Sequence, residues 1–252
     1  MIDPIARAEA LGNVLTSAAA QETSQPFAEA AVACCIDLIR AGEPARAVEL
    51  SAAAIGALTQ ADRSARLRLA VVHARALMGA SRFADSLAEI SEIRTLYAAE
   101  LGVAVDEDVI LKICHAANLW QTNRGSDAVT ALQAIRQALL ARADSFLLGW
   151  CSYQLSAAET VCGNYESARR YALDAVVSGR RCSDQYLQGI ALSVLSMRER
   201  ALCRWDAALE CEIEGIAIAE SAGYMRLAAI AMRGRGITLW KLGRLKEAEV
   251  GV

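Results

Sequence analysis

The residues with the most distinctive chemistry in this chain are its eight cysteines and two histidines. Zinc sites and redox pairs use short cysteine spacings such as C-x-x-C, and no such pair occurs here. Most of the cysteines lie among apolar residues, so we expect small buried side chains in a reducing cytoplasm, with redox sensing as the alternative. We expect no metal and no cofactor. The cysteines are Cys34, Cys35, Cys114, Cys151, Cys162, Cys182, Cys203 and Cys211.

The two histidines, His73 and His115, each precede a small residue by one position. That shared setting favours histidines that are hydrogen-bonded at a helix interface, and a pH-sensing pair is the alternative. Catalysis needs titratable groups that converge, and the sequence shows no glycine-rich phosphate loop and no Ser/His/Asp arrangement. We therefore predict that the chain is not an enzyme.

Charge and hydropathy argue against two further classes of partner. The 26 basic and 29 acidic residues give a formal net charge of −3. No basic run is present to neutralise phosphates, so we expect no direct nucleic-acid binding by this chain. No apolar stretch is long enough to span a membrane, and the N-terminus lacks the basic start and apolar core of a signal peptide. We expect a cytoplasmic protein that does not bind membranes.

A short phrase recurs along the chain at a nearly constant interval. CGNYESA (162–168), CRWDAA (203–208) and LGRLKEA (242–248) each combine a small or polar residue, an aromatic or large apolar residue, and a final alanine. Equivalent final residues follow one another at intervals of 39, 42, 40, 40 and 40 residues. We call them the anchors: Ala47, Ser86, Ala128, Ala168, Ala208 and Ala248. Such a period predicts a repeat architecture.

Each repeat is predicted to form two helices with the phrase at the turn between them. Apolar residues recur at helical spacing before the phrase, as in LQGIALSVLSM (187–197), and after it, as in ARRYALDAVV (168–177). Another small residue lies twelve positions before each anchor, and two small residues allow two helices to approach closely. The composition is 55% hydrophobic but only 5% aromatic, with three prolines, which favours an all-α fold.

The pattern resembles the tetratricopeptide repeat (TPR) family over residues 25–252. In the fourth repeat, the family's small residue, turn glycine, aromatic and alanine correspond to Ser156, Gly163, Tyr165 and Ala168. The last repeat matches at Gly236, Gly243, Leu245 and Ala248. The third repeat departs from the pattern, with Asn123 and Gly125 at the turn and no aromatic. The period also exceeds the family's usual value of about 34. Longer repeats of this kind are similar to those in bacterial transcription activators and signalling proteins.

The resemblance implies a right-handed superhelical solenoid. Its parts would be an N-terminal capping helix at 1–24 and six helical hairpins at 25–252, the last one truncated. A solenoid normally ends in a polar cap. We therefore expect the N-terminal piece of a longer protein with a downstream effector domain. A short protein that forms a homodimer through its C-terminal end is the alternative.

The resemblance also implies that the first helix of each repeat lines a concave groove. The residues transferred to this groove by register include three tryptophans, several arginines and a lysine, and no acid. They are Arg68, Val71, Arg75, Ile113, Ala117, Trp120, Gln121, Trp150, Tyr153, Met197, Arg200, Arg233, Ile237, Trp240 and Lys241. Aromatic residues with arginine favour an acidic peptide or protein as ligand. Small-molecule acids, nucleotides, simple packing against neighbouring helices and the absence of a discrete site are the alternatives.

The function predicted from the sequence is a protein-interaction and sensory repeat module. It would be the N-terminal regulatory part of a larger bacterial signalling or transcription-regulating protein. The alternative is a stand-alone scaffold or adaptor whose groove is filled by packing and whose partner binds the convex face or the ends.

Overall fold

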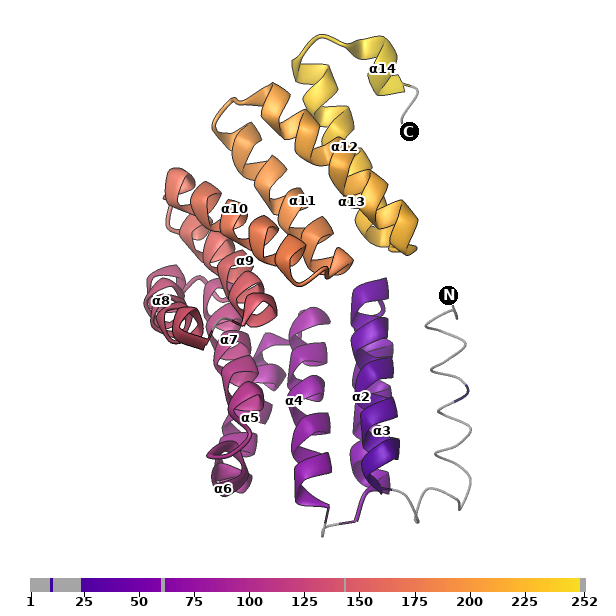
Figure 1. Cartoon of the computed structure of the whole chain (residues 1–252), viewed down its shortest axis with the longest axis vertical. Coiled ribbons are helices and arrows are strands. Elements are labelled where there is room, and N and C mark those ends of the chain that lie inside the picture. Colours follow the sequence, from indigo (N-terminus) through magenta and orange to yellow (C-terminus); the bar gives the residue numbers. More distant parts are fainter. Residues whose placement is uncertain (1–9, 11–23, 60–61, 143, 250–252) are drawn as a thin grey trace. The chain divides into compact units, whose positions relative to one another are not determined.

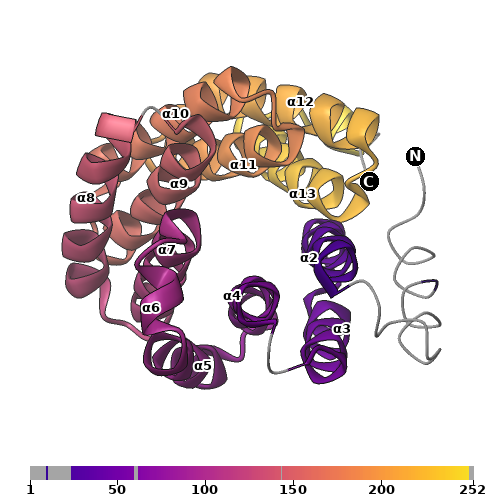
Figure 2. The same ribbon diagram turned by 60° about the horizontal axis from the view of Figure 1, so that its bottom comes forward.

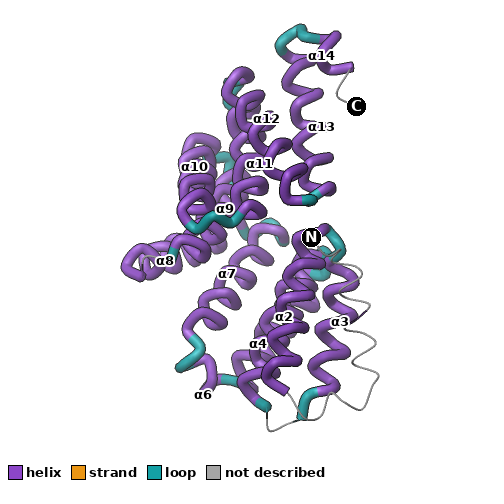
Figure 3. The backbone as a smooth tube through the Cα atoms, turned by 45° about the vertical axis from the view of Figure 1, so that its right-hand side comes forward, coloured by secondary structure: helices purple, strands orange, loops and turns teal. Residues whose placement is uncertain are grey.

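The computed structural model describes residue 10 and residues 24–59, 62–142 and 144–249. Within these residues every regular element is an α-helix, and Figure 3 shows only helices joined by short loops. The predicted all-α class is therefore confirmed. Most of the predicted capping helix at 1–24 and the last residues of the predicted sixth hairpin, 250–252, lie outside the described residues. The chain divides into two compact units, Met1–Asn118 and Leu119–Val252.

The first unit is a stack of antiparallel helices. Its helices are α2 (Ser24–Ala41), α3 (Pro44–Ala57), α4 (Arg63–Gly79), α5 (Phe83–Leu96), the short α6 (Ala98–Leu101) and most of α7 (Val105–Gln121). Helices α2, α3 and α4 pack against one another and lie side by side in Figure 1, and α5 packs on α4. Successive hairpins that pack in this way are the arrangement of a helical-repeat solenoid.

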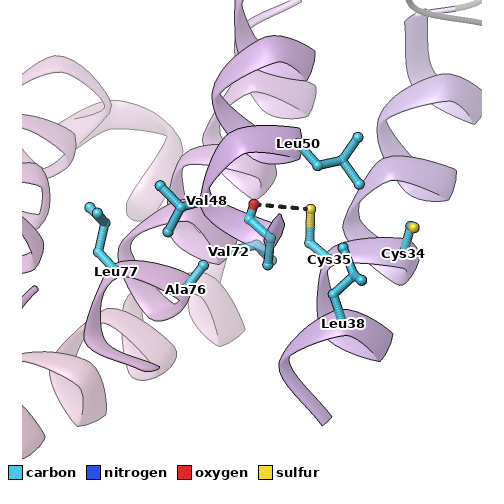
Figure 4. Close-up of a cluster of buried hydrophobic side chains, with 9 residues drawn as sticks. Cys34, Cys35, Leu38, Val48, Leu50, Val72, Ala76 and Leu77 are labelled. Atoms are coloured by element: carbon cyan, nitrogen blue, oxygen red, sulfur yellow. Dashed lines mark hydrogen bonds between the residues drawn. The ribbon is translucent and has the colours of Figure 1, made fainter. Parts of the chain in front are cut away.

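The predicted contact between the small residues is present in the first unit. In α2 and α3, the Sγ atom of Cys35 donates to the backbone oxygen of the anchor Ala47 at 3.7 Å (Figure 4). In α4 and α5, the anchor Ser86 donates from Oγ to the backbone oxygen of Ala74 at 2.9 Å. Leucine and valine side chains fill the space beside Cys35 in Figure 4. The small residues therefore let the two helices of a hairpin meet at backbone level.

The second unit continues the same alternation. It contains α8 (Gly125–Arg142), α9 (Ser145–Val161), α10 (Tyr165–Arg181), α11 (Gln185–Ala201), α12 (Trp205–Ala222), α13 (Met225–Lys241) and the short α14 (Leu245–Glu249). Each helix packs on the next one in the sequence, and α11 also contacts α9 and α13. Figure 2 shows two layers in this unit, with α9, α11 and α13 in one layer and α10 and α12 in the other.

The recurring phrase forms the same backbone turn each time. Five residues before every anchor, φ lies between 58° and 90°, in the left-handed region. These residues are Gly42, Ser81, Asn123, Gly163, Cys203 and Gly243. The next backbone N–H then bonds to the carbonyl five residues back, as from Asn164 to Glu159 at 2.9 Å, which is the Schellman helix ending. The fixed interval between phrases is thus an interval between helix-ending turns. The division into six repeats itself stays a prediction.

A second repeated contact sets the spacing between α9, α11 and α13. A Cβ atom on Gly149 would lie 2.7 Å from Leu187, and one on Gly189 would lie 2.6 Å from Leu227. A leucine of the next helix in the same layer thus packs against each glycine, and the two contacts are 40 residues apart. Sequence analysis missed this pair, although the 40-residue period of the leucines and glycines was visible.

The third repeat departs from the TPR pattern for a packing reason. Gly125 stands where the second, fourth, fifth and sixth repeats carry an aromatic or leucine, and it is buried. A Cβ atom there would lie 2.9 Å from the Sγ atom of Cys162 and 3.2 Å from Val161. The turn of the fourth repeat therefore occupies the space that an aromatic side chain would need.

Candidate functional site

Four of the predicted groove residues are buried. The exposed fractions are 2% for Val71, 0% for Ile113, 1% for Ala117 and 5% for Trp150. These side chains pack within the protein, so they offer no surface to a ligand. Tyr153 is half-buried and packs against an apolar cluster between α10 and α11. For these positions, the packing alternative describes the structure better than the groove.

Two of the predicted groove cations already have acidic partners. Arg68 lies 3.5 Å from Glu29 and 3.5 Å from Glu107. Arg200 forms an ion pair with Glu212, whose side chain is fully buried. Their charge is therefore largely compensated inside the protein, and we no longer count either residue as a groove cation.

Three other predicted groove residues, Arg75, Trp120 and Gln121, differ in burial and in their contacts. Arg75 is half-buried and makes contacts of its own within the protein. Trp120 donates from Nε1 to Oε1 of Gln154 at 3.0 Å, which fixes its indole against α9. Gln121, at the end of α7, is exposed. None of the three joins the exposed group described next.

The remaining predicted residues form one exposed surface in the second unit. Met197 is 45% exposed, Ile237 46% and Trp240 59%, and Arg233 and Lys241 are also exposed. Arg233, Ile237, Trp240 and Lys241 lie along one side of α13. Ile230 extends this stripe by one turn. Met197 holds the equivalent position of α11, 40 residues before Ile237, and α11 contacts α13. We call this surface the α11–α13 face: Met197, Ile230, Arg233, Ile237, Trp240 and Lys241.

The cations of the α11–α13 face are not neutralised by acids of their own layer. Helix α13 contains no acidic residue, and the single acids of α9 and α11, Glu159 and Glu199, are buried. Arg233 makes no ion pair or hydrogen bond within the described part of the chain. Lys241 lies over the Trp240 ring, 4.5 Å from its centre. The face is therefore apolar and positively charged.

A buried polar cluster beneath this face holds α11, α12 and α13 together. Glu212 of α12 accepts hydrogen bonds from Arg200 of α11 and, at 3.1 Å, from Oγ1 of Thr238 of α13. Burial raises the pKa of Glu212, and the Thr238 bond and the Arg200 charge oppose that shift. Gly234 lies directly against this pair, because a Cβ atom there would lie 2.9 Å from atoms of Arg200 and Glu212. Gly234 is therefore a point of close helix packing, whereas a Cβ atom on Gly236, the small residue of the last repeat, would meet no described side chain within 4 Å.

The histidine and cysteine predictions are resolved in part. His73 Nδ1 lies 2.8 Å from Oγ of Ser51, and burial lowers the pKa of His73, as expected of a hydrogen-bonded interface histidine. His115 also has interactions within the protein. Four cysteines are buried, three are half-buried, and Cys203 is exposed, so the expectation of burial fails at that position. No group of three metal-binding side chains occurs among the residues that the structure describes.

The first unit contains a cavity of about 540 Å³ between α4 and the α6–α7 segment. Its lining is Ser64, Leu67, Arg68, Ala99, Glu100, Val103, Ala104 and Glu107. The charges at its rim are paired, Arg68 with Glu107 and Arg63 with Glu100. The cavity therefore presents no uncompensated charge to a ligand.

In the described parts of the chain, no helix is both long and apolar enough to cross a membrane.

Comparison with known proteins identifies the fold. No protein-family model and no curated protein matches the sequence. A Rap protein complexed with competence and sporulation factor superposes with a TM-score of 0.70 at 12% identity, over 97% of this chain and 77% of the Rap chain. A signal-transduction ATPase with a tetratricopeptide-repeat sensor, from Pyrococcus horikoshii, matches with a TM-score of 0.59 at 14% identity, over 97% and 36% of the two chains.

A third similar structure is a kinesin light chain with TPR-like repeats from Podospora anserina. Its TM-score is 0.52 at 16% identity, over 81% of this chain and 99% of that chain. These likenesses confirm the fold predicted from the sequence, a solenoid of TPR-like helical repeats.

Proposed function

We propose that this chain is a protein-interaction module that binds an acidic peptide segment of a partner protein on the α11–α13 face. The supporting observation is the combination of exposed Ile237 and Trp240 with Arg233, a cation that has no acidic partner among the described residues. Aromatic residues with arginine are frequent among residues that dominate binding energy. A segment with carboxylates beside apolar side chains matches both properties of the face.

The geometry beneath the face supports a preformed surface. The ion pair of Arg200 with Glu212 and the hydrogen bond of Thr238 join all three helices that carry or support it. A surface held by buried polar contacts loses less conformational freedom on binding than a loop does. The face therefore suits a ligand that adapts to it, such as a flexible peptide.

We also propose that the module is the sensory part of a larger bacterial signalling or transcription-regulating protein. The support is the likeness to a Rap protein solved with competence and sporulation factor and to the sensor-bearing ATPase. In such a protein, occupation of the face would change how the repeats pack on an effector domain. The gene sequence beyond the codon for Val252 tests this: an effector domain supports the proposal, and a stop codon overturns it.

Binding itself is tested with immobilised short amphipathic peptides whose polar faces are acidic, neutral or basic. We expect the acidic peptides to be retained best. The tightest binder is then titrated into the protein while tryptophan emission is recorded. Trp240 is the most exposed tryptophan, so its emission should shift to the blue when a peptide covers it. In Trp240→Phe that shift should disappear.

Charge reversal supplies the matched control. Arg233→Glu should weaken the acidic peptide by about tenfold or more, because it replaces attraction by repulsion. Arg181→Glu, an exposed arginine on α10 in the other layer, should leave the affinity unchanged. Equal weakening by both variants, or equal binding of acidic and basic peptides, would show that the face does not recognise an acidic partner.

A further inference from the structure

Arg198 of α11 is a buried cation that has no acidic partner among the residues that the structure describes. Its exposed fraction is 7%, and its one hydrogen bond among the described residues runs from Nε to Oγ of Ser156 on α9, at 3.4 Å. A neutral hydroxyl at that distance compensates poorly for the water that a guanidinium loses on burial. Removal of a charge from water normally requires an opposite charge nearby. The sequence analysis did not single out this arginine.

The acidic residues of α9, α10 and α11 all have other partners. Helices α9, α10 and α11 contain four acidic residues. Their partners are Asn164 for Glu159 at 2.8 Å, Arg204 for Glu166 at 2.9 Å, Arg136 for Asp174 at 2.6 Å and Arg169 for Glu199 at 2.6 Å. Arg200, the other cation near Arg198, is held by Glu212. None of these four carboxylates forms an ion pair with Arg198.

Two tyrosines interact electrostatically with the guanidinium. Burial lowers the pKa of Arg198, and Tyr153 and Tyr165 oppose that shift. Tyr153 lies three residues before Ser156 on α9, so these two side chains share a face of that helix. Burial also raises the pKa of Tyr153 to about 12, so its hydroxyl keeps its proton and can donate. Neither tyrosine hydroxyl has a hydrogen-bond partner within the described residues.

We propose that Arg198, with the hydroxyls of Tyr153 and Tyr165, binds the carboxylate or phosphate group of a small-molecule ligand. The planar fork of an arginine donates two parallel hydrogen bonds to such an oxyanion, and the hydroxyls can supply two more. Burial strengthens these bonds because little water competes with them. The site is separate from the α11–α13 face in its residues, so it does not depend on peptide binding there.

The test is thermal unfolding of the whole chain in phosphate, succinate or chloride at equal ionic strength, so that general salt screening is the same in all three. A bound oxyanion stabilises the folded state by mass action. We expect phosphate or succinate to raise Tm above its value in chloride, and the larger effect identifies which of the two groups the site prefers. Arg198→Met should abolish this difference, whereas Arg181→Met, at an exposed position, should retain it.

The same variant separates binding from a structural role. If Arg198 serves only the anion, Arg198→Met should fold with unchanged or higher Tm in chloride, because a buried uncompensated charge has been removed. Tyr153→Phe keeps the ring and should raise the Kd of the preferred anion by about tenfold, since it removes one hydrogen bond to a charged group. The Tyr153→Phe variant still tests the anion site if Arg198→Met fails to fold. No anion-specific rise in the wild type, or the same rise in the variants, would overturn the site.

Discussion

Arg169 of α10 donates from Nε to Oε1 of Glu199 on α11 at 2.6 Å, and the Glu199 side chain is only 3% exposed. Glu199 lies nine residues before the anchor Ala208, where four of the six predicted repeats carry leucine. A carboxylate thus replaces a core leucine and joins the two layers of the second unit. Glu159 holds the same position one repeat earlier and accepts a hydrogen bond from Asn164.

This ion pair predicts a non-additive pair of substitutions. Arg169→Met should lower the free energy of unfolding by about 2 kcal/mol, because it leaves a buried carboxylate with weaker compensation. Glu199→Leu together with Arg169→Met should recover most of that loss, because no buried charge remains. Urea denaturation of the three proteins measures both values. A double variant as unstable as Arg169→Met alone would mean that packing, and not the unpaired charge, causes the loss.

Glu212 predicts a stability that depends on pH. Burial raises its pKa in the folded protein above the ordinary value of 4.5. The folded state therefore holds this proton more tightly than the unfolded state does. Its contribution to stability is fully present below the unfolded pKa and is lost as pH rises through the folded pKa. We expect the Tm of the wild type to fall relative to that of Glu212→Gln as the pH rises across that range. A difference that is constant with pH would contradict the raised pKa.

Two helical glycines predict opposite effects of the same substitution. Gly149→Ala should destabilise the protein by about 1–3 kcal/mol, because the new Cβ would lie 2.7 Å from Leu187 and 2.8 Å from Ser178. Gly236→Ala should stabilise it by roughly 0.5–1 kcal/mol, because the new Cβ would meet no described atom within 4 Å beyond its own stretch of helix, and alanine favours the helix. Thermal unfolding of both variants gives the signs. A Tm of Gly149→Ala equal to or above that of the wild type would show that the close contact at Gly149 does not control packing.

The architecture was predictable because its signals are local. Three signals recur: a left-handed turn residue, a small residue twelve positions before the anchor, and apolar residues at helical spacing. Each involves only residues of the same helix or of two consecutive helices. Their recurrence every 39 to 42 residues therefore predicted both the helices and the turns. Even the departure at Gly125 was visible, although its cause, the approach of Cys162 and Val161, was not.

The sequence by itself therefore determined the helical-repeat fold, the positions of its turns and the small residues at the helix crossings. The tertiary structure alone decided which members of the predicted groove reach solvent. Trp150 and Trp240 looked equivalent in the sequence, yet one is buried and the other is the most exposed apolar residue of the α11–α13 face. Arg200 and Arg233 differ in the same way, since only Arg200 meets a carboxylate within the described part of the chain. Exposure and charge compensation depend on residues of other helices, and repeat position does not encode them.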